Sequence, residues 1–61
     1  MNWSLQVAIA IKDVMEYILE SEMEGKLDKE DPYYPTYITL QWLKQKIEDE
    51  NEITMEDYQK W

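Results

Sequence analysis

The sequence contains no cysteine, no histidine, no arginine and no phenylalanine. Without Cys the chain forms neither a disulfide nor a thiolate-bound metal site, and without His a zinc ion would have only carboxylate ligands. Ser and Thr hydroxyls also have no imidazole base to activate them for nucleophilic catalysis. We therefore expect no metal, no cofactor and no enzymatic activity.

Positive charge is scarce as well. Six Lys stand against fourteen Asp and Glu, so the formal net charge of the 61 residues is −8. Because phosphate binding draws its affinity from Lys and Arg, we expect no direct binding to free nucleic acid. A helix-turn-helix formed by residues 40–50 and 55–61 would bring the acidic Glu56 and Asp57 into a DNA groove, which argues against a DNA-reading role.

Long apolar runs are missing. The longest stretch without charge, residues 1–11, is shorter than the about 20 residues that a membrane-spanning helix needs. No Lys or Arg precedes it, as would be typical of a signal peptide. We expect a soluble cytoplasmic protein with no membrane partner.

Aromatic and apolar residues are plentiful for so charged a chain. They make up 44% of it, with three Trp and five Tyr, which is too much buryable surface for a disordered composition. The length allows one small domain, residues 1–61, with a marginal core of roughly 3–5 kcal/mol. Since no disulfide is available, the remaining source of stability is association with another chain.

Residues 4–24 are predicted to form one long helix, with Ser4 as N-cap and Gly25 as the stop signal. The inward positions follow +4, +3, +4 spacing and form an apolar arc of roughly 200°: Val7, Ile11, Val14 and Ile18, flanked by Ala8, Met15 and Leu19. Residues 5–11 also alternate like a strand, but the two Ala and the continuing 3.6-residue period favour a helix.

Residues 25–38 are predicted to be the connection, stiffened by Pro32 and Pro35, with residues 36–39 extended. A second helix is expected over residues 40–50, capped by Thr39 and ended by Asn51 in the left-handed conformation. Its expected inward residues are Leu40, Leu43 and Ile47, with Lys44, Gln45, Lys46 and Glu48 facing water.

A third helix is expected over residues 55–61. Thr54 and Asp57 resemble a capping box with Asp in place of Glu or Gln. Met55, Tyr58 and Trp61 share one face. The fold class is therefore all-α, with three helices of which the N-terminal one is long.

The apolar arc of the first helix is wider than two short helices can cover. We therefore predict a symmetric homodimer through this helix. Its contact is expected to include three residues: Trp3, Leu5 and Ile9.

Four acidic residues recur along the first helix at +3, +4, +4 spacing, opposite the apolar arc: Asp13, Glu16, Glu20 and Glu24. On a helix they would extend over about 16 Å. This acidic rail has two interpretations. It either keeps the helix solvated, or it binds positive charge on a partner, at a surface that normally holds phosphates.

Aromatic residues offer anchors for the same contact. Tyr33 and Tyr34 lie in the proline-stiffened connection and Trp42 lies off the inward stripe, and such side chains dominate interface energetics. The alternative, which also applies to Tyr37 and Trp61, is that these rings cover a thin core.

The acidic run Glu48 to Glu52 offers oxygen ligands of the kind that calcium and magnesium ions bind. Aligned with a calcium-binding loop from Asp49, it places Ile53 fifth, Thr54 at the glycine position and Lys60 at the bidentate position. The pattern does not fit, and we expect a charged helix end.

No family motif is present. The general profile, which is short, acidic and free of Arg and Cys, is similar to that of small phage-encoded inhibitors and anti-defence proteins, and this likeness implies an inhibitor but carries over no residue. We predict a non-enzymatic acidic protein-binding module that occludes a basic, nucleic-acid-binding surface of a larger partner, in the manner of a DNA mimic. The alternative is a structural or oligomerisation module that binds through its apolar face, with the charge serving solubility only.

Overall fold

The computed structural model describes residues 3–60, and its regular secondary structure over that range is helical throughout. The chain forms helix α1 (Trp3–Tyr17), the π-helical turn η1 (Ile18–Glu22), helix α2 (Tyr34–Asn51) and the short helix α3 (Met55–Gln59). No strand occurs in this part of the chain. The prediction of an all-α fold with a long N-terminal helix is confirmed.

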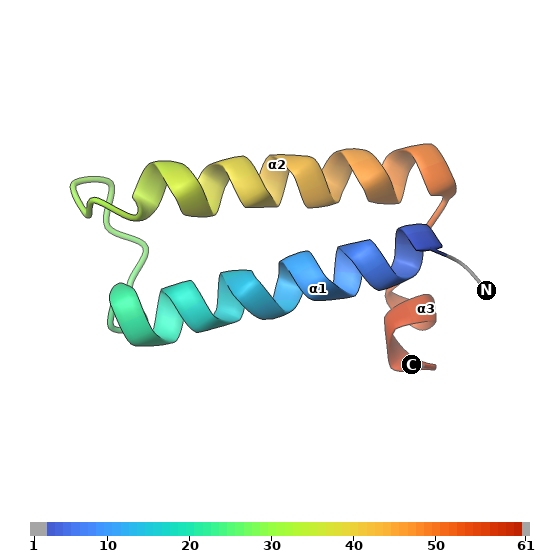
Figure 1. Cartoon of the computed structure of the whole chain (residues 1–61), viewed down its shortest axis with the longest axis horizontal. Helices are drawn as coiled ribbons and strands as arrows, with labels where there is room; N and C mark the ends of the chain where they lie inside the picture. The colour runs from blue at the N-terminus through green and yellow to red at the C-terminus, as the bar shows by residue number, and fades with distance from the viewer. Residues whose placement is uncertain (1–2, 61) are drawn as a thin grey trace.

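Helices α1 and α2 lie side by side and run in opposite directions, joined by a loop at one end (Figure 1). Helix α3 lies beside the first turns of α1 (Figure 1), so the N-terminal and C-terminal parts of the chain are neighbours. The molecule measures 37 × 19 × 15 Å along its principal axes. It is a helical hairpin, one layer thick.

Helix α1 and the first residue of η1 turn one stripe of side chains inward at +3, +4, +3 spacing, which suits an antiparallel helix pair: Ala8, Ile11, Met15 and Ile18. The expected inward residues Val7 and Val14 are instead 44% and 48% exposed. The apolar arc is broad enough for either stripe to face inward. The position of α2 decides which stripe is buried, because α2 packs over Ala8 and Met15 rather than over Val7 and Val14.

The π-helical turn has an identifiable cause. If α-helical geometry continued beyond Tyr17, Glu22 would stand one turn after Ile18 on the inward face. The wider turn, in which the Met23 amide donates to the Ile18 carbonyl at 3.0 Å, replaces that residue by Met23. Met23 is 3% exposed, whereas Glu22 faces water. The turn thus avoids burying an unpaired carboxylate.

The first helical segment ends before the predicted residue 24. Glu24 and Gly25 both have positive φ, 54° and 77°, and the Gly25 amide donates to the Leu19 carbonyl at 2.7 Å. Gly25 is left-handed, as expected of a stop residue, but the helical turns end at Glu22 and Glu24 is the first left-handed residue after them. Glu24 lies beyond the helical turns rather than on them.

Helix α2 begins at Tyr34, six residues before the predicted start at residue 40. Pro35 occupies its first turn, where a missing N–H costs nothing. The Asp31 carboxylate accepts a hydrogen bond from the Tyr33 amide at 2.8 Å, and the Asp31 carbonyl accepts one from the Tyr34 amide. The prediction of an extended segment over residues 36–39 is wrong, because Pro35 starts the helix instead of preventing it. Thr39 lies inside the helix, and its Oγ1 donates to the Pro35 carbonyl.

The inner face of α2 is less apolar than expected. Leu40 and Ile47 are half-buried as predicted, but so are Lys44 and Glu48, which were expected to face water. Leu43 is 40% exposed. None of the residues of α2 is fully buried.

Helix α2 ends one residue later than expected. The left-handed residue is Glu52, with φ 53°, and not Asn51. Asn51 is still helical, and its Nδ2 donates to the Ile47 carbonyl at 2.9 Å.

The capping box at the start of α3 is confirmed. The Thr54 amide donates to Asp57 Oδ2 at 2.8 Å, and the reciprocal bond from the Asp57 amide to the Thr54 side chain is also present. Met55 does not join a core, since it is 74% exposed. Trp61 lies outside the described residues.

The core is thin. It consists of six residues with little exposed surface: Ala8, Ile11, Met15, Ile18, Met23 and Ile53. Met23 follows η1 at the loop end of the hairpin, and Ile53 lies in the link between α2 and α3. Neither was singled out from the sequence. Met23 falls within the predicted helix 4–24 but off its inward period, which the π-helical turn shifts by one residue, and Ile53 lies between two predicted helices. The two ends of the hairpin are therefore closed by side chains from its turns.

Substituting Met23 tests whether the stability of the hairpin depends on the side chain that closes its loop end. Met23→Ala removes the side chain that closes the loop end, and we expect the free energy of unfolding to fall by about 2–3 kcal/mol. Met55→Ala is the matched control, because Met55 is largely exposed and its truncation should change stability by less than about 0.5 kcal/mol. Urea unfolding followed by circular dichroism measures both. Equal losses in the two variants would contradict the assignment of Met23 to the core.

Candidate protein-binding surfaces

The side of α1 that points away from α2 carries Asp13 and Glu16, and Glu20 follows on η1. All three side chains are exposed. We call Asp13, Glu16 and Glu20 the outward acidic face. Glu24 is exposed too, but it lies past the end of η1 with φ 54°, so helical spacing no longer relates it to the other three.

The outward acidic face is only partly neutralised. Lys12 Nζ lies 2.8 Å from Glu16 Oε1, and this hydrogen bond, with the attraction of the carboxylate, raises the pKa of the Lys12 ammonium. Asp13 and Glu20 make no ion pair with any residue of the described range. Two of the three carboxylates therefore remain available to an external cation.

The predicted tyrosine anchors lie at the start of α2, at the loop end of the hairpin (Figure 1). Tyr33 is 42% exposed and Tyr34 is half-buried. Hydrogen bonds from both backbone amides to Asp31 hold this segment in place. Tyr33 is thus the more accessible of the two rings.

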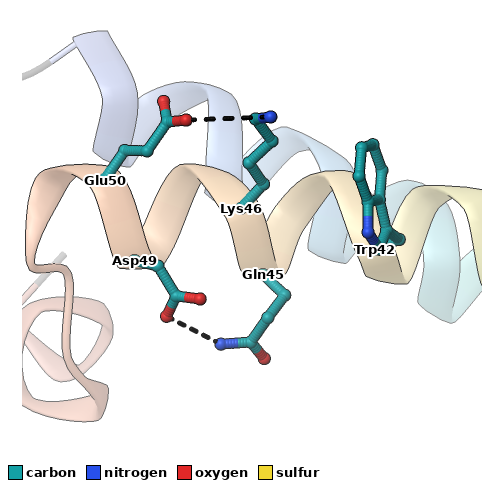
Figure 2. Close-up of a pocket in the computed structure, with 5 residues that line it drawn as sticks. All are labelled: Trp42, Gln45, Lys46, Asp49 and Glu50. Atoms are coloured by element: carbon teal, nitrogen blue, oxygen red, sulfur yellow. Dashed lines mark hydrogen bonds and ion pairs between the residues drawn. The ribbon is translucent and has the colours of Figure 1, made fainter.

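Trp42 lies on the outer side of α2, where it is 63% exposed. Figure 2 shows it at one end of an open hollow that is otherwise lined by polar side chains: Gln45, Lys46, Asp49 and Glu50. Lys46 Nζ lies 5.4 Å from the centre of the Trp42 ring and 3.9 Å from Glu50 Oε1, while Gln45 Nε2 donates to Asp49 Oδ1 at 3.0 Å. These interactions keep the polar groups of the hollow occupied with one another.

Trp42 and the outward acidic face do not form one surface. The acidic face is opposite the inward stripe of α1, and Trp42 is about 160° from the inward residues of α2 by helical geometry. Since the two inward stripes face each other, Trp42 and Asp13 point to opposite edges of the hairpin. One flat partner surface cannot contact both.

A polar cluster that the sequence analysis missed joins α3 to α2. Lys44 Nζ lies 2.7 Å from Glu48 Oε2, and the Tyr58 hydroxyl donates to the same oxygen at 2.6 Å. The Lys44 ammonium also lies 5.2 Å from the centre of the Tyr58 ring. The i,i+4 pair on α2 is visible in the sequence, but its position against α3 is a tertiary feature.

The polar cluster shifts the titration of its members. Burial opposes the ionisation of Glu48, but the hydrogen bonds from Lys44 and Tyr58 outweigh it, so the pKa of this carboxyl lies below its usual value. Burial, the hydrogen bond to Glu48 and its negative charge raise the pKa of the Tyr58 hydroxyl. The cluster is therefore a carboxylate held in its charged form by two donors.

A second apolar surface occupies α1, displaced by one residue from the buried stripe and hence rotated by about 100°. We call it the exposed apolar stripe, and it consists of Trp3, Val7, Ala10, Val14 and Tyr17. Of the residues predicted for a dimer contact, Trp3 belongs to it and is 73% exposed. Leu5 and Ile9 are half-buried and lie on the other flank of α1.

No group of three or more acidic side chains within residues 3–60 is arranged to hold a metal ion. None of the helices in this range is long and apolar enough to cross a membrane.

Comparison with protein-family models, curated proteins and solved structures finds no match for this chain.

Removal of the Tyr58 hydroxyl should weaken the attachment of α3. Tyr58→Phe keeps the ring against Lys44 but deletes the donor to Glu48, so at pH 7 we expect a loss of about 1–2 kcal/mol in the free energy of unfolding. The pKa of the Glu48 carboxyl in the folded protein lies below its usual value of 4.5. The stability that the hydrogen bond to the charged Glu48 carboxylate contributes is therefore present above pH 4.5. It is lost as the pH falls through the lower pKa of the folded state. The difference between wild type and variant should shrink towards about pH 3, measured by thermal unfolding.

The control is the same change in a Glu48→Gln background, where the acceptor has no charge to lose. There the effect of Tyr58→Phe should not vary over this pH range. A pH-independent difference in the wild-type background would show that Glu48 is not the acceptor.

Proposed function

We propose that this protein is a non-enzymatic acidic binding module that occupies a basic surface of a larger protein. The contact is made by the outward acidic face, and the surface it covers is one that otherwise binds nucleic acid. The outcome is competitive inhibition or regulation of the partner, with the protein acting as a mimic of a nucleic-acid strand.

The observation that supports the proposal is the pairing state of the acidic side chains. Asp13 and Glu20 are exposed and make no ion pair within residues 3–60, and they stand on helical turns, whose backbone is rigid. Each of them stands about one turn from Glu16, and like charges at that spacing repel, so a cationic partner relieves that repulsion. A net charge of −8 also attracts such a partner over distance and raises its association rate.

A second candidate function is homo-oligomerisation through helix α1. The exposed apolar stripe favours it, because five neighbouring positions of one helix present uncharged side chains to water. The two candidates are compatible, since the exposed apolar stripe and the outward acidic face occupy different sides of α1.

Neutralising the outward acidic face tests the first candidate. The variant Asp13→Asn, Glu16→Gln, Glu20→Gln should capture less of any basic partner from a cell extract at about 0.05 M salt. With a captured protein in purified form, the association rate should fall about tenfold and wild-type protein should displace labelled duplex DNA from it. Binding by the wild type should weaken steeply towards about 0.5 M salt.

The matched control neutralises three acids at the other end of the hairpin: Glu50→Gln, Glu52→Gln and Glu56→Gln. These residues are exposed, so the variant loses the same three charges. It also loses one lysine pair, Lys46–Glu50 at 3.9 Å, where the first variant loses Lys12–Glu16 at 2.8 Å. The proposal predicts that this control retains binding better than the first variant. Equal binding by all three proteins, or binding that does not respond to salt, would mean that the acidic residues serve solubility.

A further inference from the structure

We propose that the exposed apolar stripe of α1 is the contact of an antiparallel homodimer, in which α1 of one copy packs against α1 of a second copy. The inference rests on the oligomerisation candidate given above and specifies its face and geometry. It places the contact on Val7, Ala10, Val14 and Tyr17 beside Trp3, and not on Leu5 and Ile9.

The pattern of the exposed apolar stripe is nearly the same read in either direction. Ala10 stands at the centre of α1, a valine lies three residues before it and another four residues after it, and an aromatic residue lies seven residues away on each side. Antiparallel pairing with a second copy therefore sets aromatic rings at both ends of the contact and small side chains at its middle. Ala10 allows the two helices to approach closely, and the +4, +3, +4, +3 spacing suits helix–helix packing.

Helix α2 extends the same surface. In an antiparallel helix pair, residues that precede the packed positions of both helices lie on one side of the pair. Leu43 precedes the half-buried Lys44 just as Val14 precedes the buried Met15, so Leu43, 40% exposed, borders the stripe. Helix α3 is bound through Glu48, on the opposite side, and leaves this surface open.

The loop end of this surface also offers a place for an aromatic ring. Pro35, Thr36, Thr39 and Leu40 line an open hollow there. In the antiparallel arrangement, Trp3 of one copy comes to the loop end of the other. The largest exposed side chain of the stripe thus meets a hollow rather than a flat surface.

The available area matches what a dimer needs. With about 200 Å² for an aromatic side chain, the exposed 73% of Trp3 and 63% of Tyr17 amount to roughly 270 Å². The two valines and Leu43, each 40–48% exposed, bring the apolar area to roughly 450–500 Å² per copy. Two copies supply about 900–1,000 Å², which is the apolar share of a small specific interface of about 1,600 Å².

The charge distribution predicts how dimerisation through this contact depends on salt. The stripe itself is uncharged, while each copy carries −8, so association buries apolar surface against a long-range repulsion. Added salt screens that repulsion and strengthens apolar association. Dimerisation should therefore tighten with salt, whereas binding of a basic partner should weaken.

Sedimentation equilibrium of wild type and two lysine variants tests the proposal. Val14→Lys places a charge in the contact and should raise the dimer dissociation constant at least about tenfold. Met55→Lys makes the same change in net charge on α3, away from the contact, and should leave dimerisation as in the wild type or stronger. Circular dichroism verifies that both variants remain helical. A wild type that stays monomeric at about 0.5 M salt, or equal effects of the two variants, would overturn the proposal.

Cross-linking tests the direction of the pairing. The chain has no native Cys, and the antiparallel arrangement places Ala10 beside the twofold axis. Ala10→Cys should therefore form a disulfide-linked dimer under mild oxidation, while Gln41→Cys, exposed on the far side of α2, should not. Equal cross-linking at both positions would exclude this geometry. The outcome of these dimerisation experiments does not decide whether the outward acidic face binds a partner. That binding is tested separately, and it should weaken with salt whereas dimerisation should tighten.

Discussion

The contact between the inward stripe of α1 and the half-buried face of α2 is the constraint on which the rest of the molecule depends. This contact, which we call the seam, is the only layer of packing between the two helices. Ile11 and Met15 of α1 are buried in it, and α2 contributes no fully buried side chain. A hairpin with one layer cannot surround its core, so the ends must be closed by Met23 and Ile53. Small domains of this kind retain little margin of stability and gain from a partner.

The register of this seam also divides the surface of α1. Once Ala8 and Met15 face α2, Val7 and Val14 are turned to one flank, and Asp13 is turned away from the hairpin. One helix therefore carries a packed stripe, an apolar stripe and an acidic face. An apolar contact and an electrostatic contact can coexist on it, and they respond to salt in opposite directions.

Polar residues are accommodated where the seam reaches its ends. At one end, the π-helical turn keeps Glu22 in water and brings Met23 inward. At the other, Lys44 and Tyr58 both donate to Glu48, so the carboxylate at the edge of the core is satisfied. The first geometry keeps a carboxylate out of the core, and the second supplies two donors to a carboxylate that is half-buried.

Local signals in the sequence determined the all-α class, the long first helix and the capping box at Thr54, because each depends on residues close together along the chain. The same signals misplaced the start of α2, since Pro35 is compatible with an extended segment and with a first helical turn alike. They left open which stripe of the broad apolar arc is buried, whether Lys44 and Glu48 meet water, and how far Trp42 lies from the acidic residues. Only the tertiary structure decided these points, because each depends on where a second helix packs, and a period of 3.6 residues describes one helix without specifying its neighbour.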